Sequence, residues 1–180
     1  DVEDNVFLMG VKEFYAYGGT VQRLPCTVRD YVFDDFNLLQ REKVVAATNT
    51  AFSEIWWFYP SGSSDTNDRY VVYNYEQQVW YYGALARSYW MDRGIFDNPI
   101  AAGPNNYLYT QESGFDDDGS ALTAYIESSQ MDIGDGEQFA FIKRMIPDLT
   151  FRGSTAGSPS ANLTVKTRNF PGGNYLHTTD

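Results

Sequence analysis

The sequence predicts an all-β fold of mainly antiparallel strands, with β-propeller-like blades, one short helix and a second β-subdomain. Aromatic residues make up 17% of the 180 residues, and aromatic side chains favour the pleated, half-buried surface of a strand. Short apolar runs alternate with turn signals, which draw on 15 glycines and 7 prolines. The hydrophobic fraction of 43% is typical of a globular chain, so disorder is not expected.

The N-terminal part of the chain predicts three strands and then a helix. The strands span residues 5–10, 13–17 and 20–24, and a Gly-Gly pair at 18–19 marks a tight turn. In the stretch that follows, apolar residues recur four positions apart, which is a helical spacing. We therefore predict a short helix over residues 27–38, with an irregular loop as the alternative.

The next segment predicts a four-stranded blade. Runs rich in aromatic and β-branched residues span 43–47, 54–59, 69–75 and 78–82. They occupy about 40 residues, the size of one propeller blade. The run at 54–59 is apolar at successive positions, which predicts a strand buried from both sides. An imperfect repeat, residues 14–21 over 72–79, predicts the same strand–turn–strand unit twice.

Beyond Gly83 the pattern is less regular. Residues 84–94 indicate a helical turn or an ordered loop, and 107–112 and 123–128 indicate a hairpin around the acidic loop 115–119. Further strands are predicted over 139–145, 149–152 and 163–168, with a flexible loop at 153–160. We expect a blade region over residues 1–104 and, over 105–180, a β-rich subdomain or further incomplete blade.

Composition excludes several classes of protein. The balance of 13 basic against 24 acidic residues gives a net charge of −11, which argues against tight binding to a phosphate backbone. The single cysteine, Cys26, excludes an internal disulfide framework and a multi-cysteine zinc site. The longest apolar cluster, residues 55–59, is too short to cross a bilayer. The chain begins at Asp1 without a methionine, so a fragment of a longer polypeptide or a processed chain is expected.

The candidates for chemistry are few, and no catalytic, cofactor-binding or metal-binding residue is predicted. His177, the single histidine, lies in a polar terminal run, and Cys26 fits a buried structural thiol better than a nucleophile. The acidic runs Asp116–Gly119 and Asp132–Glu137 are candidates for calcium binding, but neither completes the spacing of a calcium loop, so solvated turns are favoured. Paired carboxylates would suit a glycosidase, yet no spacing selects two of the acidic residues.

Several stretches resemble structural proteins of tailed bacteriophages. The most specific is E-I-W-W-F-Y-P at 54–60, and the others are residues 22–37, 67–75, 79–83, 126–128, 132–136 and 146–151. The chain is similar to the tail nozzle (tail tubular protein B) and to tail hub, or packaged-DNA stabilisation, proteins of short-tailed phages. The resemblance implies a longer chain with propeller-like blades, assembled as a ring, commonly a hexamer, around the DNA exit channel. It implies a structural role, so no catalytic residues are transferred.

Two functions are therefore expected, in order. The first is a non-enzymatic virion protein without cofactor, located in the phage tail and made in the host cytoplasm. Its partners would be other copies of itself, neighbouring tail proteins and DNA that passes through the channel without sequence-specific binding. No membrane partner is expected. The alternative is a carbohydrate-binding or carbohydrate-cleaving β-domain of a phage receptor-recognition protein, using tryptophans such as Trp80 or Trp90 near carboxylates.

Overall fold

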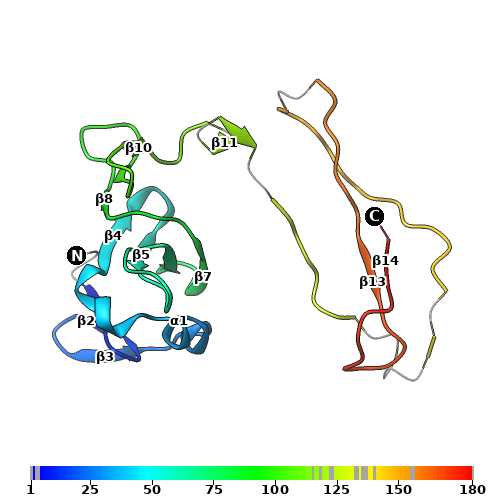
Figure 1. Cartoon of the computed structure of the whole chain (residues 1–180), viewed down its shortest axis with the longest axis horizontal. Helices are drawn as coiled ribbons and strands as arrows, with labels where there is room; N and C mark the ends of the chain where they lie inside the picture. Colours follow the sequence, from blue (N-terminus) through cyan, green and yellow to red (C-terminus); the bar gives the residue numbers. More distant parts are fainter. Residues whose placement is uncertain are drawn as a thin grey trace. The chain divides into compact units, whose positions relative to one another are not determined.

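The structure is a computed structural model whose described residues fall into two compact units. It describes residues 2, 5–114, 116–117, 119–121, 124–131, 134, 138–139, 141–154 and 157–179. Unit 1 is Asp1–Leu122 and unit 2 is Thr123–Asp180, and Figure 1 traces the chain through both. Each unit is described by itself.

The predicted all-β class is confirmed, because all the paired strands of the described chain are antiparallel. Unit 1 contains three meander sheets in chain order. The first is β1 (Val6–Met9), β2 (Phe14–Tyr17) and β3 (Val21–Leu24). The second is β4 (Val45–Asn49), β5 (Glu54–Tyr59), β6 (Arg69–Asn74) and β7 (Val79–Ala84). The third is β8 (Tyr89–Met91), β9 (Ile100–Ala102) and β10 (Leu108–Thr110).

Short helices and two small hairpins complete the described elements. The helices are α1 (Arg29–Asp34) and two 3-10 turns, η1 (Leu38–Lys43) and η2 (Thr50–Phe52). The hairpins are β11 (Asp116–Asp117) with β12 (Ser120–Ala121) in unit 1, and β13 (Val165–Thr167) with β14 (His177–Thr179) in unit 2. The described sheets do not close on themselves, so a propeller remains a prediction.

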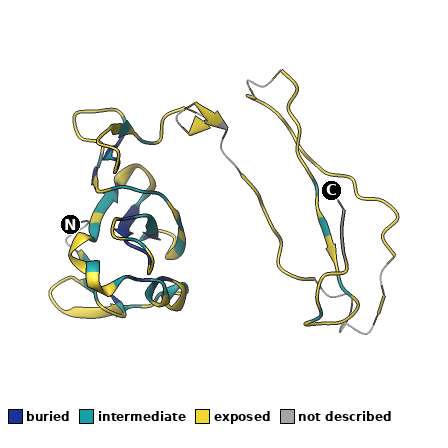
Figure 2. Ribbon diagram, in the orientation of Figure 1, coloured by how far each residue is buried: buried dark blue, intermediate teal, exposed yellow. Residues whose placement is uncertain are grey.

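The three sheets of unit 1 stack in the order in which the chain makes them. Figure 1 shows β8 and β10 at one end of the unit, the β4–β7 sheet in the middle, and β2, β3 and α1 at the other end. The middle sheet is therefore covered on both faces, and Figure 2 shows that the buried residues concentrate there. Covering both faces requires its strands to be apolar on both sides, as the sequence of β5 is.

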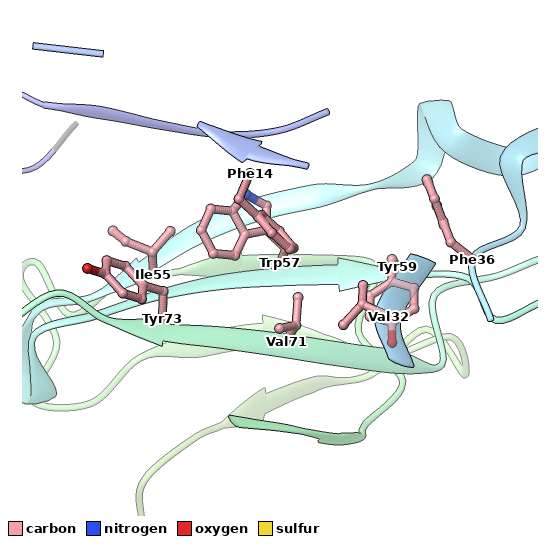
Figure 3. Close-up of a cluster of buried hydrophobic side chains, with 8 residues drawn as sticks. All are labelled: Phe14, Val32, Phe36, Ile55, Trp57, Tyr59, Val71 and Tyr73. Atoms are coloured by element: carbon pink, nitrogen blue, oxygen red, sulfur yellow. The ribbon is translucent and has the colours of Figure 1, made fainter. Parts of the chain in front are cut away.

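The prediction that residues 54–59 form a strand buried from two sides is confirmed, because all six residues of β5 are buried. Alternate residues of β5 enter two separate clusters. Figure 3 shows the first, which combines β5 side chains with Phe14 of β2, Val32 of α1 and their neighbours: Phe14, Val32, Phe36, Ile55, Trp57, Tyr59, Val71 and Tyr73. The second lies on the opposite face and contains Trp56, Phe58, Val72, Trp90 and Ala101.

Several other predictions are confirmed with adjusted limits. Strands form within residues 5–10, 13–17 and 20–24, and the four predicted runs of the blade become β4 to β7. The helix predicted over residues 27–38 is shorter, spanning Arg29–Asp34, and Val32 is its buried residue. Both copies of the imperfect repeat are antiparallel hairpins, β2–β3 and β6–β7.

The later part of the chain differs from prediction because pairing partners were misassigned. The segment 84–94 contains the strand β8 rather than a helical turn, since β9 lies beside it. The strand predicted over 107–112 pairs with β9 rather than with 123–128, and the acidic loop forms its own hairpin, β11–β12. This pairing keeps residues 105–110 in unit 1.

Unit 2 has less regular structure than predicted. The described residues of 139–145 and 149–152 form no strand, since no neighbouring strand pairs with them. The strand predicted over 163–168 is present as β13, and its partner is the terminal run that begins at His177.

Candidate functional site

The cysteine that the sequence singled out has the surroundings of a structural thiol. Cys26 is partly buried and packs against the cluster that contains Trp57. Burial raises the pKa of its thiol to about 11. A nucleophilic cysteine needs the opposite shift, because the thiolate is the reactive form.

The acidic runs and the histidine do not assemble into a site within the described chain. Asp116 and Asp117 are exposed in β11, and the Gly119 N–H donates to Asp116 Oδ1 at 3.1 Å. Asp118 and, apart from Gly134, the run at 132–137 lie outside the described residues, as does the side chain of His177. Among the residues that the structure describes, no group of three or more His, Cys, Asp or Glu side chains is placed to hold a metal ion.

The most developed polar cluster surrounds a buried carboxylate at the start of β5. Glu54 is 9% exposed. Its Oε2 accepts a hydrogen bond from the indole Nε1 of Trp56 at 2.8 Å and a longer one from Asn49 Nδ2 at 3.4 Å. Its Oε1 accepts from the hydroxyl of Tyr81, whose pKa is raised by burial and by this hydrogen bond. Three donors from β4, β5 and β7 therefore compensate the loss of hydration of one charge.

A second carboxylate joins this cluster from the loop after β10. Asn49 Nδ2 also donates to Glu112 Oε1 at 3.3 Å, so one amide bridges Glu54 and Glu112. Loss of hydration, followed by the negative charge of Glu54, raises the pKa of Glu112 above its ordinary value, and the Asn49 hydrogen bond acts in the opposite direction. Glu112 also has a φ of 54°, a left-handed conformation that costs energy in a residue with a Cβ. The fold therefore holds Glu112 beside Glu54 against both charge repulsion and backbone strain.

A cavity of about 500 Å³ lies beside this cluster. Trp56, Trp90, Tyr109 and Glu112 are among the residues that line it. Arg87 also lines it, with its guanidinium 4.6 Å from the centroid of the Tyr109 ring. The cavity is open to solvent, and its lining combines aromatic surface, one cation and the carboxylates of Glu112, Asp116 and Asp117.

The chemistry that this cavity can support is limited by what faces it. Glu112 lines the cavity, and its carboxyl pKa is raised above the ordinary value, chiefly because burial removes hydration. Glu54 is not among the lining residues, and its oxygens are engaged by three donors. The bridged pair is thus arranged to anchor the loop after β10 to the blade rather than to act together on a ligand.

The tryptophans offered for sugar stacking are engaged with other side chains. Trp90 stacks on Trp56 with ring centroids 5.2 Å apart, and its Nε1 donates to the Thr48 carbonyl at 3.0 Å. Trp80 stacks on Trp57 at 5.9 Å and donates to the Pro25 carbonyl at 2.9 Å. A sugar platform needs an open ring face, so both rings are better suited to packing sheets together.

Sequence reasoning missed the roles of Asn49, Glu54 and Glu112. One signal was available: Glu54 is the only charged residue in a strand whose neighbours are all apolar, and a buried carboxylate requires donors. Glu112 could not be found in this way, because it lies 63 residues from Asn49 and reaches it only through the pairing of β9 with β10.

Comparison with known proteins adds no assignment. No family model matches the chain, and no curated protein matches it. Within the described residues, no helix has the length and apolar character needed to cross a membrane.

Proposed function

We propose that this chain is a virion structural protein, part of a phage tail nozzle or hub ring that forms or seals the DNA exit channel. The proposal is supported by the position in the fold of the motif E-I-W-W-F-Y-P, which is the most specific part of the resemblance to phage tail proteins. Residues 54–59 of this motif form β5, which lies between two other sheets and is buried on both faces. The resemblance thus rests on the residues that build the core.

The distribution of charge supports a role next to passing DNA. Unit 1 contains 18 of the 24 acidic residues and 8 of the 13 basic residues. Unit 2 contains the other 6 acidic and 5 basic residues. Unit 1 therefore carries a net charge of −10 out of −11. A wall of this sign repels phosphate and forms few long-lived contacts with a duplex, which allows DNA to slide.

The surface of unit 2 supports a role in assembly. Its described residues are mostly exposed, as Figure 2 shows, and they include large apolar side chains such as Ile126, Phe139 and Phe141, which are 100%, 87% and 85% exposed. Its regular structure is one two-stranded sheet, which is marginally stable in isolation. Exposed apolar surface on this scale is typical of segments that other protein covers.

The proposal assigns partners and a location accordingly. Other copies of the chain in a ring, a hexamer in our expectation, and neighbouring tail proteins would cover the exposed apolar surface. DNA would pass through the channel without sequence-specific binding. The protein would be made in the host cytoplasm, reside in the virion and act without a cofactor, a membrane or enzymatic chemistry.

The test is the location of the protein in purified particles. Quantitative mass spectrometry of intact particles should find the chain at a fixed small copy number, and antibody labelling should mark the tail. Tailless capsids from the same preparation serve as the control and should lack it. A protein that occurs in infected cells but is missing from particles would refute the proposal.

One observation favours a second candidate, a carbohydrate-binding domain. The cavity beside Glu54 combines Trp56, Trp90 and Tyr109 with the carboxylate of Glu112, and protein sites for sugars combine aromatic rings with carboxylates. Glycan-array binding that is lost in Glu112→Gln and retained in Asp97→Asn would support this candidate. We expect no binding, because Trp56 and Trp90 stack on each other.

A further inference from the structure

Two carboxylates share one amide beside the start of β5, and one of the two is free to leave. Asn49, which is fully buried in β4, donates from the same Nδ2 to Glu54 at 3.4 Å and to Glu112 at 3.3 Å. Glu54 is fixed, because it is buried and also accepts from Trp56 and Tyr81. Glu112 lies at an exposed position, and within the described chain the bond from Asn49 is the one hydrogen bond to its carboxylate. Glu112 is therefore the member of the pair that can detach.

The backbone around Glu112 has a fixed point on one side and strain on the other. The Gln111 N–H donates to the Pro99 carbonyl at 2.8 Å, so the chain is held to the sheet as far as this residue. Glu112 follows with a φ of 54°, and Gly114 has a φ of 82°. This left-handed conformation costs energy at Glu112 but little at Gly114, which has no Cβ. A rotation of the backbone just after Gln111 would therefore relieve strain.

The charged groups around the Glu112 carboxylate add repulsion rather than a counter-charge. Glu54 lies on the other side of the shared amide. Arg87, the cation of the cavity lining, lies over the ring of Tyr109 and donates to the Ala86 carbonyl at 2.8 Å. The other titratable groups that line the cavity or contact residues next to the cluster are acidic or neutral: Asp92 after β8, Asp116 and Asp117 of β11, and the hydroxyls of Tyr70, Tyr81 and Tyr109 on β6, β7 and β10. Ionised Glu112 is therefore held mainly among like charges.

The cavity beside the cluster makes detachment of the ionised carboxylate favourable. Gln111, Glu112 and Ser113 are consecutive residues of its lining, and the cavity is open to solvent. Ionised Glu112 therefore regains hydration when it leaves Asn49. Protonation has the opposite effect, because it removes the repulsion from Glu54 while the neutral carboxyl still offers an oxygen to the Asn49 amide. Loss of hydration and the charge of Glu54 raise the pKa of Glu112 in the attached state, which agrees in sign.

We propose that Glu112 is an acid-favoured latch on this wall of the cavity. With its carboxyl protonated, it holds the segment 112–114 against the blade through Asn49. With its carboxyl ionised, it releases the segment, which widens the cavity, while the Gln111 N–H stays bonded to the Pro99 carbonyl. The released carboxylate is hydrated and has its ordinary pKa of 4.5, so release becomes easier as the pH rises from 4.5 through the higher pKa of the latched state. The latch belongs to unit 1 alone and is independent of the proposed role in a phage tail.

Nuclear magnetic resonance of the ¹⁵N-labelled chain at a series of pH values from 4 to 7 tests the latch. The heteronuclear Overhauser effects of the Ser113 and Gly114 amides report fast backbone motion, and they should fall as the pH rises. The side-chain amide signal of Asn49 should shift with the same midpoint, which should lie above 4.5. The ratio of released to latched molecules should increase about tenfold for each unit by which the latched pKa of Glu112 exceeds the released one.

Glu112→Gln and Asp97→Asn are the matched variants, since each replaces one exposed carboxylate by its neutral amide. The amide oxygen of Glu112→Gln can accept from Asn49 as a protonated carboxyl does. This variant should therefore keep Ser113 and Gly114 ordered at every pH. Asp97 is not in the cavity lining, so Asp97→Asn should show the pH dependence of the unchanged chain. Far-UV circular dichroism at each pH checks that the chain is folded.

Two results would overturn the latch. The first is equal mobility of Ser113 and Gly114 at all pH values while the side-chain carboxyl signal of Glu112 titrates. The second is a pH-dependent change that persists in Glu112→Gln, because it would belong to a different group. If the chain unfolds in acid, the comparison at pH 7 still decides: Ser113 and Gly114 should be less mobile in Glu112→Gln than in the unchanged chain, and equal mobility would refute the latch.

Discussion

Replacing Trp57 with alanine should remove a large part of the stability of unit 1. The Trp57 side chain is 1% exposed and lies in the middle of β5. Its ring centroid is 5.0 Å from that of Phe14 and 5.9 Å from that of Trp80. Truncation of a fully buried tryptophan typically costs about 3–5 kcal/mol, because it leaves a cavity among side chains that relax only partly. The free energy of unfolding of a domain is typically about 5–15 kcal/mol. Trp57→Ala should therefore unfold a large fraction of the molecules near physiological temperature.

Phenylalanine variants distinguish the effect of lost ring volume on stability from the effect of a lost hydrogen bond. Trp57 Nε1 is buried without a partner among the described residues, whereas Trp56 Nε1 donates to Glu54 at 2.8 Å. Trp57→Phe therefore removes an unpaired donor together with ring volume, but Trp56→Phe deprives a buried carboxylate of one of its donors. Because hydrogen bonds to charged groups contribute about 1.5–3 kcal/mol, we expect Trp56→Phe to destabilise more than Trp57→Phe. Trp56→Ala and Trp57→Ala should each destabilise the fold strongly and prevent ring assembly.

The assay is urea unfolding monitored by far-UV circular dichroism, with each unfolding curve normalised to the folded and unfolded baselines of its own variant. Ser63→Ala, at an exposed position of the loop between β5 and β6, is the matched control and should change the free energy of unfolding by less than about 0.5 kcal/mol. A loss of less than about 1 kcal/mol in the free energy of unfolding of Trp57→Ala would show that Trp57 is not packed in the core. Loss of ring assembly with an unchanged unfolding curve would show that the tryptophans act at a contact between copies.

Three further predictions concern single groups. Tyr59→Phe should leave the urea midpoint unchanged or raise it, because the Tyr59 hydroxyl is buried without a partner among the described residues; a loss above about 1.5 kcal/mol would reveal a missing partner. The raised pKa of Glu112 means that the folded protein holds this proton more tightly than the unfolded chain does. Its ionisation therefore lowers stability as the pH rises from the unfolded value through the folded pKa, and the penalty disappears as the pH falls. Glu112→Gln should accordingly raise the melting temperature at pH 7 and flatten the pH dependence of the melting temperature above pH 4.5, the ordinary carboxyl pKa, whereas Asp97→Asn should do neither. Burial raises the thiol pKa of Cys26 from 9.0 to about 11. Cys26 should therefore react with iodoacetamide at pH 8 about a hundredfold more slowly in the folded than in the unfolded protein, because the thiolate is the reactive form. Equal rates would show that the Cys26 thiol is exposed in the folded protein.

The central blade could be predicted because its information is local. Each strand from β4 to β7 is five or six residues long, and the apolar residues on both faces of β5 show directly that it is covered twice. The weaker predictions involved short strands whose identity depends on a partner. β8 and β9 have three residues each, and three residues carry no periodicity that separates a strand from a loop.

The polar cluster shows the same limit. Asn49 and Glu54 are five residues apart and lie on adjacent paired strands, so a buried carboxylate with a nearby amide donor was within reach of the sequence. Glu112 enters the cluster from the loop after β10, and its left-handed backbone leaves no trace in the residue type. A contact of this kind follows from how sheets stack, which a single sequence does not encode locally.

Electron cryomicroscopy of the tail of intact particles would show whether this chain forms a ring at the DNA exit channel. We expect a symmetric ring whose repeating density fits the three stacked sheets of unit 1, with β5 in the middle and the side chains of Trp56 and Trp57 on its opposite faces. A complete map of the tail in which every ring is explained by other proteins, with no density for these sheets, would contradict it.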